Sequence, residues 1–425
     1  MSRSKLGMVL FSSALAVFLV IGGVLGKSSS SSDGAYRQLG VYSEVLSRIK
    51  TDYVEEPDIK EVTSGALHGV LEALDPFSSY LTPEEYAEYQ KKKNNGKGDL
   101  GLVVSKKFGY VAVVSALPGS PAAKAGLTNG DILESINGSS TREMSLEQAK
   151  MLFSGKPGTT LTASLVRASR AEPQNVTLKR EVLTPTAVTV KQVEAGVGYL
   201  RVDSFPKGRA SEIAQRLEQL AAGGARSLVL DLRNTAEGEI SEATTTADLF
   251  LDHGLITYLQ GQKYPRQDFN ATAGGAKIKL PVVVLVNRGS AGPAEVLAAA
   301  LQENGRAEVV GEKTYGVGSV QKIIPLDDGS ALLLSVAKYY TPGGKAIQDN
   351  GVTPGTLVAE SRPDAIEQPE SDQEEDSTAP PSKPPTPRRL PHMILEDKTP
   401  PQPKEDLPLK RGIELLKGGA EKKAA

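Results

Sequence analysis

The chain is poor in the side chains that most often carry out chemistry in proteins. It contains no cysteine, which excludes disulfide bonds, thiolate catalysis and cysteine metal ligands. Its three histidines, His68, His253 and His392, lie far apart in the sequence and in no spacing typical of metal ligands. We therefore expect no metal ion and no cofactor.

The composition is that of a globular protein with more than one packed core. The chain has 425 residues, of which 39% are hydrophobic and 24% are charged, enough for two or three domains. Lysine and arginine total 49 against 51 aspartate and glutamate, so no overall basic field would attract nucleic acid. We expect no nucleic-acid partner.

The N-terminus resembles an export signal. Residues 7–26 form an uncharged apolar run of 20 residues, and Arg3 and Lys5 precede it on what would be the cytoplasmic side. The run is long enough to stay in the membrane as an anchor, and its small-residue cleavage site is weak. We expect an exported protein that faces the periplasm or the extracellular side, anchored through residues 7–26, or secreted if the signal is cleaved.

The spacing of apolar residues predicts an α+β multidomain chain. Helical spacing dominates at first, then short strands with glycine turns, then buried strands that alternate with helices. The expected parts are a signal or anchor with its tether at 1–32, a helical region at 36–95, a β-rich module at 96–183, an α/β core at 184–358, a disordered Pro-rich acidic linker at 359–407, and a short C-terminal helix and tail at 408–425.

The β-rich module resembles a PDZ domain. The stretches GDLGLVV, SALPGSPAAKAGLTNGDILESINGSS and SLEQAKMLFSGKPGTTLTASLVR carry this resemblance in order. In that family a turn, here Leu100, Gly101 and Leu102, offers backbone N–H groups to the C-terminal carboxylate of a peptide that adds as a strand. The resemblance implies that polypeptide C-termini bind here. Gln148 and Met151 of the following helix are the candidates to face the groove, while Ala149, Leu152 and Phe153 would pack inward, and periodicity does not decide between the two faces.

The α/β core resembles the carboxyl-terminal processing peptidases of peptidase family S41. The resemblance runs from about residue 36 to 357 and is carried by blocks such as VGYLRVDSFPKG, SLVLDLRN, VVLVNRGSAGPAEVLAAALQENGRAEVVGEKTYGVGSVQ and YYTPGGKAIQDNGVTP. In active members a lysine removes the proton from a serine, which then attacks a peptide carbonyl. The resemblance therefore implies a serine-type peptidase fold.

The residues that would carry out this reaction are replaced. Where the family has Ser-Ala-Ser-Ala-Ser-Glu, with the middle serine as nucleophile, this chain has Gly292; where the family has the lysine base, it has Val317. The two positions lie 25 apart, which is the family spacing, and Gln321 follows in register. The oxyanion loop, Asn-Asn-Pro-Gly-Gly in the family, places a carboxylate at Glu237, which opposes a developing negative charge.

The replacements are compatible with an intact scaffold. Gly292 can stand at the N-cap of a helix, Pro293 suits the first helical position, and the carboxylate of Glu295 favours a helix N-terminus. The sequence thus predicts a peptidase fold that has lost its nucleophile but keeps the helix behind it.

Three hypotheses follow. The first is a pseudopeptidase that binds polypeptide C-termini in the cell envelope without cutting them. The second is an active endopeptidase in which Ser290 and Lys313 form a shifted dyad, with Gln321 beside them. The third is a scaffold or regulatory subunit that joins an active peptidase relative.

Overall fold

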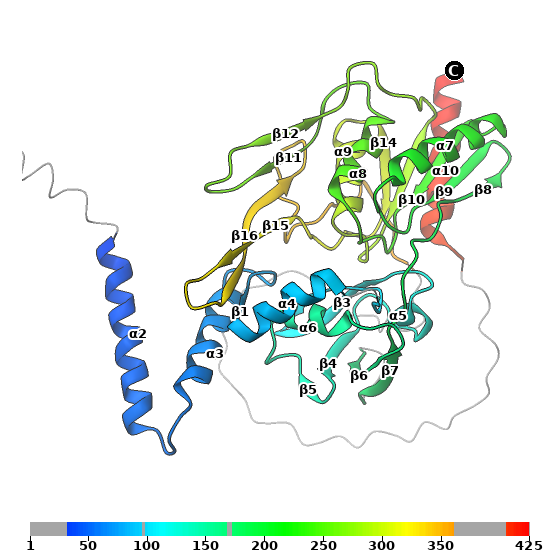
Figure 1. Cartoon of the computed structure of the whole chain (residues 1–425). Coiled ribbons are helices and arrows are strands. Elements are labelled where there is room, and N and C mark those ends of the chain that lie inside the picture. Colours follow the sequence, from blue (N-terminus) through cyan, green and yellow to red (C-terminus); the bar gives the residue numbers. More distant parts are fainter. Residues whose placement is uncertain (1–31, 96–97, 168–171, 361–404, 425) are drawn as a thin grey trace, which may run out of the picture. The chain divides into compact units, whose positions relative to one another are not determined.

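The computed structural model describes residues 32–95, 98–167, 172–360 and 405–424 (Figure 1). The predicted export segment 7–26 and nearly all of the Pro-rich linker lie outside these residues. None of the helices in the described ranges combines the length and the apolar character that a membrane span requires. The chain divides into two compact units, Met1–Gly69 and Val70–Ala425.

The predicted N-terminal helical region is present as α2 (Ser32–Asp52), α3 (Ile59–Glu72) and α4 (Pro83–Asn95). At the start of α4 the backbone N–H of Thr82 donates to Glu85 over 2.8 Å and the Glu85 N–H donates back to the Thr82 hydroxyl, a capping box. The sequence did not indicate β1 (Ser79–Leu81), which pairs antiparallel with β16 (Ala331–Tyr340). A strand of three residues is too short to show a periodicity, so tertiary pairing decides its conformation.

The β-rich module has the predicted sheet. Its strands follow the order β2-β3-β4-β6-β7, with β5 added to β4, and all neighbours are antiparallel. Their bounds are β2 Leu102–Lys107, β3 Tyr110–Ala116, β4 Ile132–Ile136, β5 Ser139–Ser140, β6 Thr160–Val166 and β7 Gln174–Lys179, with helices α5 Pro121–Lys124 and α6 Leu146–Phe153. Because β2 is an edge strand, one side of its backbone is open to a further strand.

The core contains a six-stranded, mostly parallel sheet, which confirms the α/β prediction. Its order is β17-β14-β13-β10-β9-β8, and only β8 runs antiparallel to its neighbour. The strands are β8 Thr189–Glu194, β9 Val197–Arg201, β10 Ser227–Asp231, β13 Val282–Val286, β14 Ala307–Gly311 and β17 Thr356–Leu357, and the helices between them are α7 Arg209–Ala222, α8 Ile240–Asp248 and α9 Pro293–Glu303.

The two faces of this sheet are covered by different helices. Leu228, Leu230 and Val284 pack with α7, α8 and α9, whereas the alternate residues Val229 and Val283 face the other way. Helix α10 (Leu407–Ala424) covers that second face (Figure 1) and buries Ile413 and Leu416 against it. Strands buried on both faces need apolar residues at every position, as in VVVLV at 282–286.

A second, antiparallel sheet extends from the core. Its order is β1-β16-β11-β12, and β15 pairs with β16 as well. Its remaining strands are β11 Leu255–Gln260, β12 Gln267–Asn270 and β15 Ser319–Pro325. Strand β15 begins directly after the loop that carries Val317, so this sheet fixes one side of the candidate site.

Helix α10 should contribute measurably to stability. We expect Ile413→Ala to lower the free energy of unfolding by about 2 kcal/mol or more, because the side chain is 9% exposed and its removal leaves a cavity against the sheet. Urea denaturation followed by circular dichroism measures this. The neighbouring exposed position is the control: Glu414→Ala should change stability by less than about 0.5 kcal/mol. Equal effects would mean that α10 is not docked.

Candidate active site and adjoining groove

A buried carboxylate, that of Glu295, lies between the two positions at which the family resemblance places the reactive residues. Its Oε2 accepts the N–H of Gly292 over 2.9 Å and the N–H of Val317 over 2.8 Å. Its Oε1 accepts the N–H of Gly316 over 2.8 Å and the hydroxyl of Thr314. One side chain in the first turn of α9 therefore holds both the start of the helix and the loop that precedes β15.

Two opposing effects of its environment change the pKa of the Glu295 carboxyl group. The side chain is fully buried, and burial raises its pKa to about 7 because the charged form loses its hydration. The hydroxyl and the three backbone N–H groups oppose this shift, because they stabilise the carboxylate. Near neutral pH the group is therefore close to its titration midpoint.

The backbone at Gly292 has an unusual conformation, with φ 56° and ψ −112°. This lies outside the regions that residues with a Cβ adopt readily, so glycine relieves strain there. Space is not the constraint, because a Cβ built at this position would meet only the carbonyl oxygen of Ala236, at 3.7 Å. A residue with a side chain at position 292 would therefore strain the backbone at the start of the helix, but it would not clash with neighbouring atoms.

Val317 is half-buried and packs against the hydrophobic core of the β-rich module. Other contacts attach that module to the same loops of the α/β core. The Ser115 hydroxyl donates to the Asn234 carbonyl over 2.5 Å, and the Asn129 side chain donates to the Arg288 carbonyl over 3.1 Å. An apolar side chain therefore occupies the predicted base position at a contact between the two domains.

The structure does not bring Ser290 and Lys313 together as a dyad. The Ser290 hydroxyl is completely buried, donates to the Leu232 carbonyl over 2.7 Å and accepts the N–H of Asn287 over 3.0 Å. The Lys313 side chain is exposed, and within the described part of the chain no hydrogen bond connects the two. Gln321 donates to the hydroxyls of Ser319 and Ser335 instead.

The loop that carries Glu237 is fixed at both ends. The Thr235 hydroxyl donates to the Val202 carbonyl over 2.5 Å, and Gly238, at φ 125°, lies so close to Phe205 that a Cβ would approach the Phe205 carbonyl oxygen to 2.3 Å. The Glu237 side chain is exposed at the wall of a cavity. The protein groups around it reduce its hydration, and this effect, followed by the negative charge of Asp99, raises the pKa of Glu237.

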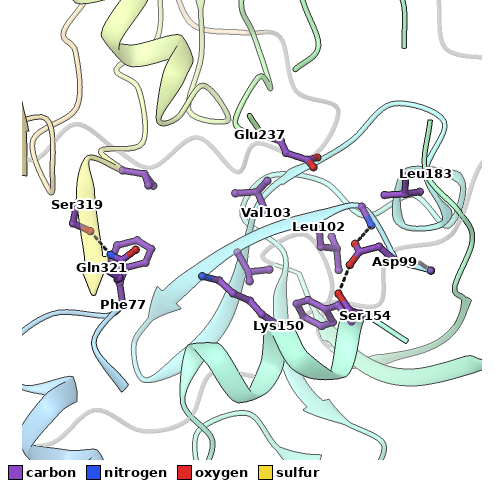
Figure 2. Close-up of a pocket in the computed structure, with 15 residues that line it drawn as sticks. Phe77, Asp99, Leu102, Val103, Lys150, Ser154, Leu183, Glu237, Ser319 and Gln321 are labelled. Carbon is purple, nitrogen blue, oxygen red and sulfur yellow. Dashed lines mark hydrogen bonds between the residues drawn. The ribbon is translucent and has the colours of Figure 1, made fainter. Parts of the chain in front are cut away.

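A cavity of about 560 Å³ joins the β2 edge to the candidate site (Figure 2). It is lined by Phe77, Gly98, Asp99, Gly101, Leu102, Val103, Val104, Lys150, Phe153, Ser154, Leu183, Glu237, Val317, Ser319 and Gln321. Residues of β2 and of the end of α6 thus share one hollow with the predicted base position and the predicted oxyanion loop.

The turn at 100–102 is partly occupied by the chain itself. The N–H of Gly101 donates to the Asp99 carboxylate over 2.8 Å, and Leu100 is fully buried. Because the Leu117 N–H donates to the Gly101 carbonyl, the N–H of Leu102 points away from β3, toward the open edge. Gly101 is also needed for packing, since its φ is 74° and a Cβ would lie 2.3 Å from that of Ser120.

Two of the residues predicted to face the groove lie elsewhere. Gln148 caps the start of α6, where its side chain accepts the Ser145 N–H and donates to Glu85. Met151 is 8% exposed and does not line the cavity. Helix α6 contributes Lys150 and Phe153 to the cavity lining, and its C-cap residue contributes Ser154. Figure 2 shows Lys150 and Ser154 there. The capping signal Ser-x-x-Gln at 145–148 was present in the sequence and could have assigned Gln148 to the helix end.

No group of three or more histidine, aspartate or glutamate side chains within the described ranges is arranged to hold a metal ion. The described residues provide an edge strand, a cavity beside it, and a helix N-terminus whose N-cap residue, Gly292, has no side chain.

Comparison with known proteins identifies the protein family. A PDZ domain model matches residues 113–167, and the model of peptidase family S41 matches residues 196–358. A carboxy-terminal-processing protease of Bartonella bacilliformis is 33% identical over 342 residues, which cover 79% of each chain. The carboxy-terminal processing protease CtpA of Bacillus subtilis is 32% identical over 80% of this chain and 73% of its own.

Among solved structures, a photosystem II D1 C-terminal processing protease superimposes with a TM-score of 0.63 at 26% identity, covering 75% of this chain and 92% of that one. The chain therefore belongs to the carboxyl-terminal processing proteases of peptidase family S41 and carries their PDZ domain.

The buried Glu295 should make stability depend on pH. Its pKa is about 7 in the folded protein against 4.5 for the free side chain, so the unfolded chain releases this proton first as pH rises. The stability that the protonated form contributes is present below about pH 4.5 and is lost toward pH 7, a change of about 2 to 3 kcal/mol.

Urea unfolding of the wild type and of Glu295→Gln across pH 4.5–8 measures this effect. The variant cannot titrate, so the difference in stability between the two proteins should change over this range. The exposed Glu218→Gln should follow the wild type. A constant difference between the wild type and Glu295→Gln would contradict the raised pKa.

Proposed function

We propose that this protein is a catalytically inactive member of its family, which holds extended polypeptide C-termini beside β2 in the cell envelope without cutting them. The observation that carries the proposal is that the nucleophile and base positions are Gly292 and Val317, and that the backbone N–H groups of both are bonded to the buried Glu295. Neither position can give or take a proton through a side chain.

The binding half of the proposal rests on the open edge of β2. A peptide that adds as a strand gains main-chain hydrogen bonds along the edge and places alternate side chains in the cavity. Leu102 and Val103 of β2 and Phe153 of α6 supply apolar contacts there. The location in the envelope rests on the apolar run at residues 7–26 with its basic flank.

The geometry gives little support to the alternative of an active enzyme. A serine nucleophile must be reachable by substrate and next to a base. The Ser290 hydroxyl is buried and donates its proton to a backbone carbonyl, while Lys313 faces solvent. Small displacements of catalytic groups already cost about 100-fold in rate, so this arrangement favours an inactive protein.

The absence of turnover is directly testable. We expect the part of the protein after Gly26, incubated with an unfolded protein that ends in apolar residues, to release no fragments by mass spectrometry. The Bacillus subtilis relative serves as the comparison enzyme. Turnover that disappears in Ser290→Ala would establish the shifted dyad and contradict the proposal. Turnover that survives in Ser290→Ala would indicate a different active site or a contaminant, which repurification distinguishes.

Peptide binding in the groove can be tested by placing a larger side chain in it. We expect a labelled peptide with an apolar C-terminus to bind in the micromolar range, about 8 kcal/mol, as is usual for one short added strand. Val103→Trp should weaken binding at least about tenfold, because Val103 lines the cavity and is not part of the domain's buried core. Phe108→Trp, in the exposed turn at the far end of the same hairpin, is the matched control. Equal affinity of the two variants would place peptide binding elsewhere.

A further inference from the structure

The cavity beside β2 carries more negative than positive charge. Among its lining residues, Asp99 and Glu237 are acidic and Lys150 is the one basic residue. The ammonium group of Lys150 lies 3.6 Å from the Glu147 carboxylate and 6.0 Å from the centre of the Phe77 ring, so nearby groups already balance its charge. The negative charge of Asp99 contributes to a raised pKa of Glu237.

The carboxylates of Asp99 and Glu237 differ in their hydrogen bonds. Asp99 accepts the Gly101 N–H over 2.8 Å and the Ser154 hydroxyl over 2.6 Å. Within the described residues, no hydrogen bond or ion pair reaches the carboxylate of Glu237, although it faces the same cavity (Figure 2). Glu237 is therefore the member of the pair that is free to contact a ligand.

Glu237 is also held in place by its backbone. The Glu237 carbonyl accepts the Phe205 N–H over 2.8 Å, and the Glu239 N–H donates to the Phe205 carbonyl over 2.8 Å. These two bonds and the close packing of Gly238 on Phe205 fix the loop on both sides of the residue. Its carboxylate is presented to the cavity by a rigid element, as a specificity contact requires.

The position of this pair has a consequence for a peptide bound as proposed above. A polypeptide end that reaches the open N–H of Leu102 brings its own carboxylate toward Asp99 and Glu237. Like charges at short range in a partly desolvated cavity repel one another, and a cation on the ligand offsets this repulsion. A metal ion fits less well, since no third metal-binding side chain joins the two in the described part of the chain.

We propose that Glu237 determines specificity by selecting polypeptide ends that carry lysine or arginine within their last few residues. The proposal rests on the proposed function, because it concerns the ligand of the same groove. The basic side chain lies in the cavity against the Glu237 carboxylate, while the rest of the segment pairs with β2. The ligand class is thus a basic polypeptide C-terminus, which neither the fold nor the family membership specifies.

The test compares three peptides that differ only at the residue before the last, which is lysine, glutamine or glutamate, on the full chain. The wild type should bind the lysine peptide about fivefold more tightly than the glutamine peptide at low ionic strength, and the glutamate peptide least well. The preference should shrink in 0.5 M salt, because screening weakens the charge contact. Fluorescence anisotropy measures all three affinities.

Two variants test whether the preference for lysine depends on Glu237. Glu237→Gln should bring the lysine and glutamine peptides to within about twofold of each other, whereas Glu239→Gln should keep the preference of the wild type. Glu239 has the same charge two residues away, is exposed, and does not line the cavity, so this pair controls for overall charge. Thermal unfolding of each variant checks that both are folded.

The outcomes separate this proposal from the proposed function. Binding of all three peptides with equal affinity by the wild type would overturn the role of Glu237 and leave the groove in place. A lysine preference that persists in Glu237→Gln would also overturn it. Failure of every peptide to bind, together with an intact fold, would remove the groove as a peptide site, and both proposals would fall.

Discussion

The interaction on which the rest of the site depends is the set of hydrogen bonds to Glu295. A carboxylate without contact with water is costly unless donors surround it, and here four donors from two separate segments do so. Because three of them are backbone N–H groups, the bonds fix the path of the chain and not merely the side chains. The start of α9 and the loop before β15 depend on this one group, and through Val317 it also contributes to the docking of the PDZ domain.

On the proposal that this protein is inactive, this dependence explains how the peptidase scaffold persists with glycine at position 292 and valine at position 317. Gly292 and Val317 take part in the site through their backbone N–H groups, which any non-proline residue supplies. Glycine at position 292 avoids strain in its backbone conformation, and valine at position 317 makes apolar contact at a domain boundary. Neither change disturbs Glu295. The hydrogen bonds that hold this site therefore need only the backbone atoms of Gly292 and Val317.

The sequence predicted the layers of the fold better than the details of the site. Continuous apolar runs such as VVVLV predicted strands buried on both faces, and the helices of the core followed from their spacing. Strand β1 was missed because three residues carry no period. Glu295 was expected only to favour a helix N-terminus, since its partners at 314–317 come from a loop that folding brings near. The residues of α6 that face the groove could not be predicted, because they depend on how the helix packs against the sheet, which periodicity alone does not determine.

The placement of α10 affects the order in which parts of the core fold. Strands β10, β13 and β14 are synthesised long before α10, yet the face that they present to Ile413 and Leu416 is apolar. Without those later residues, that face of the sheet would expose apolar side chains, which favour association with chaperones or with other nascent chains. The contact between α10 and the sheet is of high sequence separation, so it closes slowly relative to the local helices. Completion of the core therefore waits for α10.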